Sequence, residues 1–476
     1  MVALSGWRGR PGRLPGRPPL RAFLLGLATG VVYFVGTLYW TGTVIRTFGG
    51  IPTVAAIAGV ILLAFYQGAF PAVGALLGAR LIARAGVAGI LLVPAAWVSS
   101  EFFRGVAFGG FPWVPLGASQ VTVLPVAQLA SVLGVFGVSM LVALVNGIIA
   151  FALLTSGRAR VVSLAAGITL LAATGVWGAL RVADGSLTRA GSPVRVGLIQ
   201  GNIAQEDKWK ADEARRIFTT YMAMTRDAVG RGAEWVIWPE SSTPFRFEDD
   251  PEGQATLRAL TRELHVPLLF GSDQQEYGAA DSVRLYNAAF MLSPEGATAA
   301  VYRKIHLVPW GEFIPLKRWL YFVSPIVDTL TDFSPGTSVV MLPVGRHVVS
   351  TAICYEVIFP SLMRQAVQGG SELLTTITND AWYGNSSAPY QHFQLASMRA
   401  IEQGRYLARA ANTGITGVVD PYGRVVQQTT LFEPAVVVEE VRFLTDRTIY
   451  SRIGDVVAYA AMALVAVSLI VIRPRR

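Results

Sequence analysis

The only cysteine of the chain, Cys354, lies at a position that suits a nucleophile. It follows a valine-rich apolar run, His347 to Ile353, that predicts a buried strand, and Glu356 comes two residues later. In α/β sheets the chemistry gathers at strand ends, so a thiol at this point is a candidate for covalent catalysis. This segment alone leaves a second interpretation open, because an unpaired cysteine is also a common small core residue.

Two further apolar segments end in ionisable residues that could activate the thiol. Glu240 follows Trp238 and Pro239, where removal of water would raise its pKa toward that of a general base. Lys304 follows Tyr302 and Arg303 at the end of another apolar segment. Because a thiol is mostly protonated at neutral pH, we expect Glu240 to accept its proton. We expect Lys304 to stabilise the thiolate and then the oxyanion of a tetrahedral intermediate.

Two acids are candidates to hold Lys304 in place. Glu312 lies eight residues after Lys304, and Glu356 lies two residues after the cysteine. Each charged residue also has a plain interpretation when it is taken alone. Glu240 could be an exposed turn acid, Lys304 a solvated strand end, and Glu312 a salt-bridge partner. The three segments make chemical sense only together.

The segments that must position these residues alternate between strand and helix patterns from about residue 190 to residue 445. This alternation predicts an α/β layered domain with many strands. We expect strands over 194–200, 235–238, 267–271, 286–292, 347–353, 373–377, 405–411, 417–420 and 435–441, and helices over 212–229, 252–264, 360–367 and 389–404.

The same stretch contains no motif for a metal or a cofactor. It has no glycine-rich phosphate loop, and the four histidines (His265, His306, His347 and His392) lack the spacing of metal ligands. We therefore expect a site without a metal and without a cofactor.

Outside this domain the chain has the composition of a membrane protein. Hydrophobic residues make up 52% of the sequence and charged residues 15%, and the long apolar runs lie mainly between residues 20 and 180. A bilayer crossing needs about 20 apolar residues. The sequence predicts spans near 22–45, 53–83, 88–104, 127–154, 161–180 and 456–472. It therefore predicts a globular domain inserted into a polytopic helical domain.

The placement of the basic residues predicts the topology. The formal charge is +9, and the arginines of residues 8–21 and 473–476 flank apolar segments, as the positive-inside rule requires. Basic residues interleaved with aromatics on a folded face would indicate nucleic-acid binding, and this pattern is absent, so we expect no nucleic-acid partner. If 53–83 is one span, Arg80, Arg84, Arg158 and Arg160 share the cytoplasmic side with both termini.

This topology divides the chain into four parts. Residues 1–20 are a basic disordered N-terminus, 21–181 hold five spans, 190–445 form the inserted domain, and 456–472 form the last span. The inserted domain then lies on the extracytoplasmic face, together with the segment Glu101 to Gln120. That segment contains Phe111, Pro112 and Trp113. It is either an interfacial aromatic belt or one wall of a lipid-facing pocket.

The order Glu, Lys, Cys in these sequence contexts resembles the nitrilase, or carbon–nitrogen hydrolase, superfamily. With the flanking spans, the chain resembles more specifically the bacterial apolipoprotein N-acyltransferase family, from about Arg21 to its end. The resemblance is carried by WPES (238–241), YRKIHLVPWGEFIP (302–315), AICYE (352–356), QGNI (200–203) with Lys208-Trp209, GFPW (110–113) and NDAWYG (379–384).

The resemblance implies an αββα-sandwich fold and a Glu240–Lys304–Cys354 triad. It also implies that a phospholipid, typically phosphatidylethanolamine, gives an acyl chain to Cys354 as a thioester. The acceptor would be the α-amine of the diacylglyceryl-cysteine of a lipoprotein, on the extracytoplasmic face of the bacterial cytoplasmic membrane. By similarity, the supporting or substrate-binding residues are Glu312, Tyr355, Glu356, Trp209, Asn287 and Trp113.

Two other functions remain open on the sequence. A membrane-tethered amidase of the nitrilase type would use the same triad on water-soluble substrates, but it would need neither the aromatic segment nor so many spans. A transporter or scaffold would carry polar residues within its spans, and the predicted spans contain almost none.

Overall fold

The computed structural model describes residues 19–208, 210–277, 283–314 and 332–473. Trp209, one of the predicted site residues, lies outside these ranges. The chain divides into two compact units. The first, here called the helical unit, contains Met1–Gly185 and Thr448–Arg476, and the second, the catalytic unit, contains Ser186–Arg447.

The catalytic unit is built on two six-stranded sheets. The first has the order β12-β1-β2-β3-β4-β5 and the second the order β11-β10-β9-β8-β7-β6. In the first sheet β1, β2 and β3 are parallel, and in the second β7, β8 and β9 are parallel. The strands are β1 (Ser192–Gln200), β2 (Trp235–Ile237), β3 (Leu268–Tyr277), β4 (Val283–Leu292), β5 (Thr298–Arg303), β6 (Leu342–Val344), β7 (His347–Ile353), β8 (Leu374–Thr378), β9 (Leu407–Ala411), β10 (Gly417–Val419), β11 (Val425–Gln428) and β12 (Ala435–Phe443).

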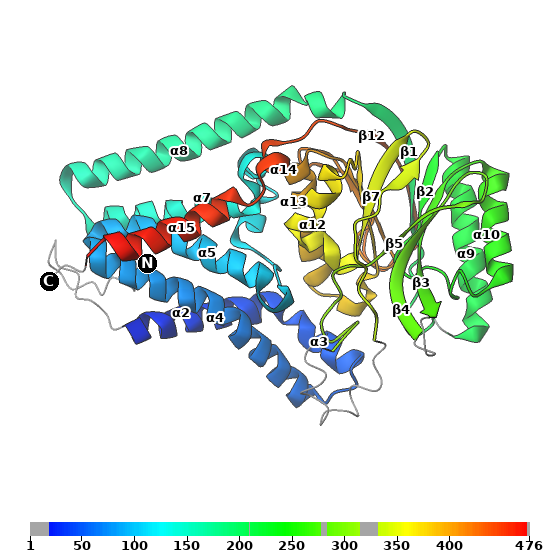
Figure 1. Ribbon diagram of the computed structural model, residues 1–476, viewed down its shortest axis with the longest axis horizontal. Coiled ribbons are helices and arrows are strands. Elements are labelled where there is room, and N and C mark those ends of the chain that lie inside the picture. The colour runs from blue at the N-terminus through cyan, green and yellow to red at the C-terminus, as the bar shows by residue number, and fades with distance from the viewer. Residues whose placement is uncertain (1–18, 209, 278–282, 315–331, 474–476) are drawn as a thin grey trace. The chain divides into compact units, whose positions relative to one another are not determined.

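The sheets face each other across one core and carry helices on their outer faces (Figure 1). Helices α9 (Ala211–Gly230) and α10 (Pro251–Leu264) cover the first sheet. Helices α12 (Pro360–Gln368) and α13 (Ala388–Gln403) cover the second. The predicted αββα sandwich is therefore confirmed.

The strands are apolar on both faces because both faces are covered. In β1, Leu198 belongs to the core between the sheets, whereas its neighbour Ile199 packs in the cluster under α9 and α10. Ile237 and Val236 of β2 divide in the same way. A strand buried on both sides reads as a continuous apolar run, which is why the sequence identified these strands.

Three strands were not predicted from the sequence, and two others were predicted to be shorter than they are. β5, β6 and β11 were not predicted, and β3 and β4 extend beyond their predicted bounds to form a hairpin of ten paired residues on each side. All four residues of β11 are exposed, so no core selects apolar residues at those positions. The outer half of β3, Asp273 to Tyr277, is mostly polar, and only Glu276 and Tyr277 are exposed.

The helical unit contains long apolar helices. These include α2 (Pro19–Leu38), α4 (Thr53–Ala85), α5 (Val93–Val106), α7 (Ala130–Leu154), α8 (Gly157–Asp184) and α15 (Val456–Val471), with the short α3 (Trp40–Thr47) and α14 (Ile449–Ile453) beside them. In the described part of the chain, four helical segments are long and apolar enough to cross a membrane: Pro19–Leu38, Thr53–Gly109, Ala130–Leu154 and Gly157–Thr188. Val456–Val471 is apolar but shorter.

Two details of this unit bear on the predicted spans. Residues 53–85 form one 33-residue helix with Pro71 in its interior, not two short helices. The span predicted near 88–104 is only partly matched by α5 (Val93–Val106), which begins and ends later in the sequence. Helix α5 continues to Val106, so Glu101 and Arg104 are buried helical residues.

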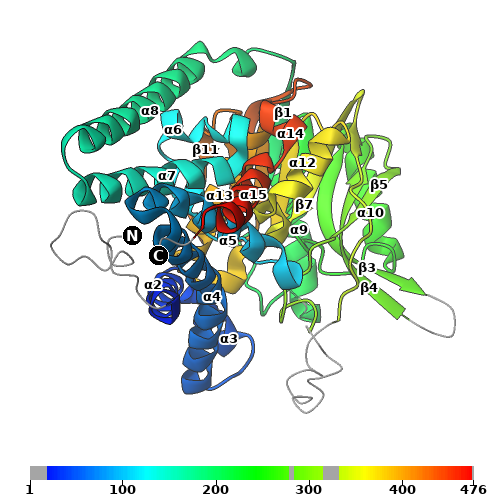
Figure 2. The same cartoon turned by 60° about the vertical axis from the view of Figure 1, so that its left-hand side comes forward.

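Helix α2 packs on α4, and the two helices lie side by side in both views (Figures 1 and 2). Small residues form the contact. A Cβ atom added to Gly30 would lie 2.7 Å from the Cα atom of Gly68 and 2.8 Å from Cγ of Pro71. Close approach of backbones at small residues is the usual way in which helices associate in a bilayer.

Candidate active site

Cys354 lies at the carboxyl end of β7, in a sharp turn from strand to helix. It is the first residue of the 3₁₀ helix η6 (Cys354–Ile358), has a φ of +52°, and is 5% exposed. A non-glycine residue with positive φ is uncommon and is held there only when its surroundings fix it. β7 runs parallel to β8, so the residues that follow the two strands lie at the same end of the sheet, beyond the carboxyl ends of the strands.

Lys304 lies between two carboxylates in the interior of the catalytic unit. It directly follows β5 and is 1% exposed. Its Nζ lies 3.3 Å from Oε1 of Glu240 and 2.8 Å from Oε1 of Glu312. Asn287, on β4, donates from Nδ2 to the same two oxygens at 2.7 and 2.9 Å. The structure thus brings together four of the residues that the sequence singled out.

The second oxygen of Glu240 connects this cluster to the other sheet. Oε2 accepts a hydrogen bond of 2.9 Å from the backbone N–H of Asn379, which directly follows β8. Since β8 is the neighbour of β7, this contact holds Glu240 at the edge of the sheet where Cys354 begins its turn.

Glu312 and Glu356 have different tasks. Glu312 contacts Lys304 directly, whereas Glu356 binds the backbone around it. Oε1 of Glu356 accepts hydrogen bonds from the N–H groups of Ile305 and His306, at 2.6 and 3.1 Å, and from the hydroxyl of Tyr302 at 2.8 Å. Its Oε2 accepts from the N–H of Ile353 at 2.7 Å. Glu356 therefore ties the segment after β5 to the turn that holds Cys354.

Two more predicted residues are buried among aromatic rings. Tyr355 is buried, and its ring meets that of Phe359 edge to face at 5.1 Å. Trp113 belongs to the helical unit, where it is buried and stacks on Phe111 at 6.0 Å. Arg104 donates to the backbone carbonyls of both Phe111 and Trp113 at 2.8 Å, so a buried guanidinium fixes the shape of this aromatic segment.

The ionisation of the three central groups follows from their burial and their mutual charges. Burial by itself would raise the pKa of Glu240, but Lys304 and Asn287 hold that pKa below its usual value. Burial would lower the pKa of Lys304, and the two carboxylates raise it well above its usual value. Burial and the charge of Glu240 raise the pKa of the Cys354 thiol to about 12. The resting site therefore holds a carboxylate, an ammonium and a neutral thiol.

Comparison with known proteins assigns both parts of the chain. Residues 195–447 match the carbon-nitrogen hydrolase family model, and residues 13–148 match the model of the apolipoprotein N-acyltransferase N-terminal domain. The apolipoprotein N-acyltransferase of Geobacter metallireducens is 38% identical over 458 residues, which cover 95% of this chain and 87% of that protein. The chain belongs to the apolipoprotein N-acyltransferase family.

Other members of the family give the same result. Those of Methylococcus capsulatus and Shewanella oneidensis are 36% and 34% identical, and each alignment covers 92% of this chain and 85% of the relative. Among solved structures, an amidase from Nesterenkonia sp. is 21% identical with a TM-score of 0.41, covering 54% of this chain and 93% of the amidase chain.

Membership of this family makes the chain a membrane enzyme and an acyltransferase. The match to the N-terminal domain model favours the acyltransferase over the amidase alternative, because it lies in the helical unit that an amidase acting on water-soluble substrates would not need. The transporter and scaffold alternatives do not agree with the family.

Two ionisable residues near Glu240, Lys208 and Asp273, were not assigned to the site by the sequence analysis. Lys208 is buried, and its Nζ donates to the backbone carbonyl of Glu240 at 3.1 Å. Burial lowers the pKa of Lys208 to about 8. Burial raises the pKa of Asp273 to about 6, and its Oδ1 lies 3.1 Å from Oγ of Ser241. Asp273 lies directly opposite Asn287 in the β3–β4 register, a pairing that only the unpredicted length of this hairpin reveals.

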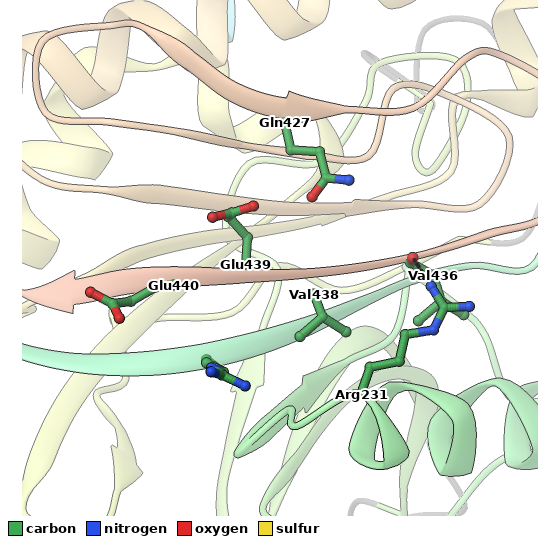
Figure 3. A pocket seen from close by; sticks show the side chains of 7 residues that line it. Arg231, Gln427, Val436, Val438, Glu439 and Glu440 are labelled. Carbon is green, nitrogen blue, oxygen red and sulfur yellow. Dashed lines mark hydrogen bonds between the residues drawn. The ribbon is translucent and has the colours of Figure 1, made fainter.

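A hollow of the catalytic unit has a lining separate from this cluster. Its volume is about 440 Å³, and it is lined by Arg195, Arg231, Gln427, Val436, Val438, Glu439 and Glu440 (Figure 3). These side chains come from β1, β11, β12 and the end of α9, and none is a predicted site residue. Among the residues that the structure describes, no group of three histidine, cysteine, aspartate or glutamate side chains could hold a metal ion.

Proposed function

We propose that Cys354 of this acyltransferase carries the transferred acyl chain as a thioester. The donor is a phospholipid, in the first instance phosphatidylethanolamine, and the acceptor is the α-amine of the diacylglyceryl-cysteine of a lipoprotein. The observation that supports this most directly is the buried Lys304, which is held between Glu240 and Glu312 and whose charge lowers the pKa of the Cys354 thiol.

The first half-reaction forms the thioester. Glu240 accepts the proton of the Cys354 thiol as Sγ attacks the carbonyl carbon of the phospholipid ester. The carbonyl oxygen becomes an oxyanion, which the Lys304 ammonium stabilises. When the tetrahedral intermediate collapses, the C–O bond breaks, and Glu240 returns its proton to the departing glycerol oxygen. The products are a thioester on Cys354 and a lysophospholipid.

The second half-reaction uses the same groups in the same order. The neutral α-amine of the lipoprotein attacks the thioester carbonyl, and Glu240 takes a proton from the attacking nitrogen. Lys304 again stabilises the oxyanion. Collapse breaks the C–S bond, gives the amide, and returns the proton from Glu240 to the sulfur. Because Cys354 is 5% exposed, water has little access to the thioester, which favours transfer over hydrolysis.

The supporting residues act on the triad. Glu312 and Asn287 fix the positions of Lys304 and Glu240 through the contacts of 2.7 to 2.9 Å described above. Glu356 fixes the backbone on both sides of the lysine and the cysteine. For Tyr355, Trp209 and Trp113, family resemblance supports roles in lining the site and binding the acyl chain.

The location that we propose is the extracytoplasmic face of the bacterial cytoplasmic membrane. Five spans within residues 21–181 and one at 456–472 would then leave residues 190–445 outside, with the arginine clusters inside. Both substrates carry their reacting groups at the membrane–water interface, so a tethered catalytic unit meets them without diffusing through solution.

The test is the mass of the intact protein after incubation with phospholipid vesicles. We expect one acyl group on the wild-type chain, removed by hydroxylamine, and no acyl group on Cys354→Ser. Since Cys354 is the only cysteine, no other thiol can form the adduct. An unchanged adduct on the variant would overturn the proposal. Vesicles of phosphatidylethanolamine and of phosphatidylglycerol, compared at equal chain length, test the donor.

A further inference from the structure

A fully buried polar cluster lies directly behind the turn of Cys354. Asp380, His392 and Arg409 have side chains with no exposed surface. They come from three elements, since Asp380 begins the 3₁₀ helix η7 (Asp380–Tyr383) after β8, His392 lies in α13, and Arg409 lies in β9. None of them contacts Lys304 or Glu240 in the hydrogen bonds and ion pairs of the described residues, and the triad mechanism does not use them.

His392 links this cluster to the nucleophile. Its Nε2 lies 3.1 Å from the backbone carbonyl oxygen of Cys354. Its other ring nitrogen, Nδ1, lies 3.0 Å from Oδ1 of Asp380 and 3.1 Å from Nη2 of Arg409. The same Nη2 donates to Oδ2 of Asp380 at 2.7 Å, and Nε of Arg409 donates to the carbonyl of Ile415 at 3.1 Å.

The contact with Cys354 shows which ring nitrogen of His392 carries a hydrogen. A carbonyl oxygen only accepts, so Nε2 of His392 must carry a hydrogen to bond Cys354. Nη2 of Arg409 has two hydrogens, and one is directed at Asp380. The other is available for the lone pair of Nδ1. Two states of the ring satisfy the bond to Cys354: the neutral ring with its proton on Nε2, whose Nδ1 accepts from Arg409, and the doubly protonated ring, whose Nδ1–H donates to Oδ1 of Asp380.

The charges around the ring favour the neutral state. Burial would raise the pKa of Asp380, but Arg409 lowers it to about 2, so Asp380 and Arg409 stay a charged pair at neutral pH. Burial and the positive charge of Arg409 lower the pKa of His392, against the effect of Asp380. The ring is therefore neutral in the range where the α-amine acceptor is reactive.

We infer that His392 is a positioning residue for the acylation of Cys354. Its Nε2–H holds the carbonyl of Cys354 and thereby keeps this residue in the left-handed conformation (φ +52°) that its turn requires. Without that hydrogen bond the backbone can relax toward negative φ, which changes the position of Sγ relative to Glu240 and Lys304. The inference rests on the proposed role of Cys354 as the acylated residue.

The tautomer can be tested on the unmodified protein. The chain has four histidines, so selective labelling of the full-length protein with ¹⁵N-histidine gives a simple spectrum, and the signals lost in His392→Gln identify His392. We expect a neutral ring with a protonated Nε2 and an unprotonated Nδ1 between pH 6 and 8. A neutral ring with its proton on Nδ1 would overturn the inference, because Nε2 could then not donate to the carbonyl of Cys354.

The consequence for catalysis is tested with two variants of one position. His392→Leu removes the donor, and His392→Gln keeps an N–H at about the position of Nε2. We expect single-turnover acylation to slow by roughly 100-fold in the leucine variant, the loss typical of a reacting group displaced by about 1 Å, and by less than about tenfold in the glutamine variant. Ser397→Ala is the matched control, because Ser397 is buried in the same helix and its hydroxyl bonds only the carbonyl of Phe393.

The outcomes separate this inference from the proposed function. If Cys354→Ser abolishes the adduct while His392→Leu acylates at the wild-type rate, only the positioning role fails. Equal slowing in the leucine and glutamine variants would also overturn it, because the donor would then not matter. If His392→Leu fails to fold, the tautomer measured on the wild-type protein still tests whether Nε2 of His392 can donate to Cys354.

Discussion

At the scale of single residues, Glu240 is negatively charged in the resting site, Lys304 is positively charged, and the Cys354 thiol keeps its proton. A thiol with a pKa of about 12 is almost entirely neutral at pH 7, so Cys354 is not a thiolate in the resting enzyme. The proton must leave as the acyl carbonyl arrives. Glu240 is available for this step because its low pKa keeps it ionised.

Removal of the Glu240 charge should therefore change two reactions in opposite directions. We expect Glu240→Gln to slow acylation by phospholipid by roughly 100- to 10,000-fold, because the general base is lost. The same variant should speed alkylation of Cys354 by iodoacetamide, because the carboxylate no longer raises the pKa of the thiol. Both rates can be read from the mass of the intact protein over time.

The matched control is Glu263→Gln, which changes an exposed carboxylate that pairs with Arg226. It should leave both rates as in the wild type. If alkylation and acylation fell together in Glu240→Gln, the carboxylate would be supporting the structure of the site and not accepting the proton.

The pH profiles of these two reactions should also differ in the wild type. Alkylation requires the thiolate, so its rate constant should rise about tenfold per pH unit from pH 7 to pH 10, still below the thiol pKa of about 12. Acylation requires ionised Glu240, whose pKa lies below the usual value of about 4.3. Its rate should thus stay level through neutral pH. A plateau of alkylation at pH 8 to 9 would contradict the thiol pKa.

Only part of this site could be predicted from the sequence. Glu240, Lys304 and Cys354 each end an apolar run, and that signal is local. His392 lies in the middle of a helix and Asp273 within a polar strand, so nothing near them in the sequence marks a site. Their roles depend on contacts such as that between His392 and Cys354, which are 38 residues apart and meet only in the folded chain.

At the scale of elements, Glu356 joins β5 to the turn after β7. It accepts four hydrogen bonds, from Tyr302, Ile305, His306 and Ile353. A glutamine at this position has one acceptor oxygen and places an N–H₂ group where the second oxygen accepts. We expect Glu356→Gln to lower the free energy of unfolding by about 3 kcal/mol, since buried donors lose their partners. Thermal unfolding in detergent measures this, and the exposed Glu295→Gln should show no shift.

The packing of α2 on α4 gives a prediction with a control in the same helix. A Cβ at Gly30 would meet the backbone of Gly68 at 2.7 Å, whereas a Cβ at Gly36 would meet nothing within 4 Å. We expect Gly30→Ala to destabilise the helical unit by about 1–3 kcal/mol, because the helices must move apart. Gly36→Ala should be neutral or stabilising by up to about 1 kcal/mol. A similar unfolding temperature for both variants would contradict the close packing.

The elements that the sequence predicted well are those whose burial leaves a continuous apolar run. β1, β7 and β8 are buried on both faces, and their predicted bounds differ from the observed ones by two residues or fewer. The exposed β11 and the three-residue β6 leave no such run. The bounds of α5 (Val93–Val106) differ more from the predicted span 88–104, because Gly86–Leu92 form the separate 3₁₀ helix η1 before it.

At the scale of the whole molecule, the single cysteine makes the proposed topology testable. Cys354→Ser gives a chain without cysteine, into which one reporter can be placed at a time. Gln428→Cys puts a thiol on the exposed β11 of the catalytic unit, and Arg158→Cys puts one on the exposed start of α8.

A membrane-impermeant maleimide should label Gln428→Cys in intact cells and Arg158→Cys only after the membrane is permeabilised. This follows because the positive-inside rule assigns the arginines at 158 and 160 to the cytoplasm and leaves residues 190–445 outside. Labelling of both reporters after permeabilisation controls for exposure. The reverse pattern in intact cells would place the catalytic unit in the cytoplasm, away from the outer leaflet where the proposed acyl acceptor presents its amine, and the proposed location would then be wrong.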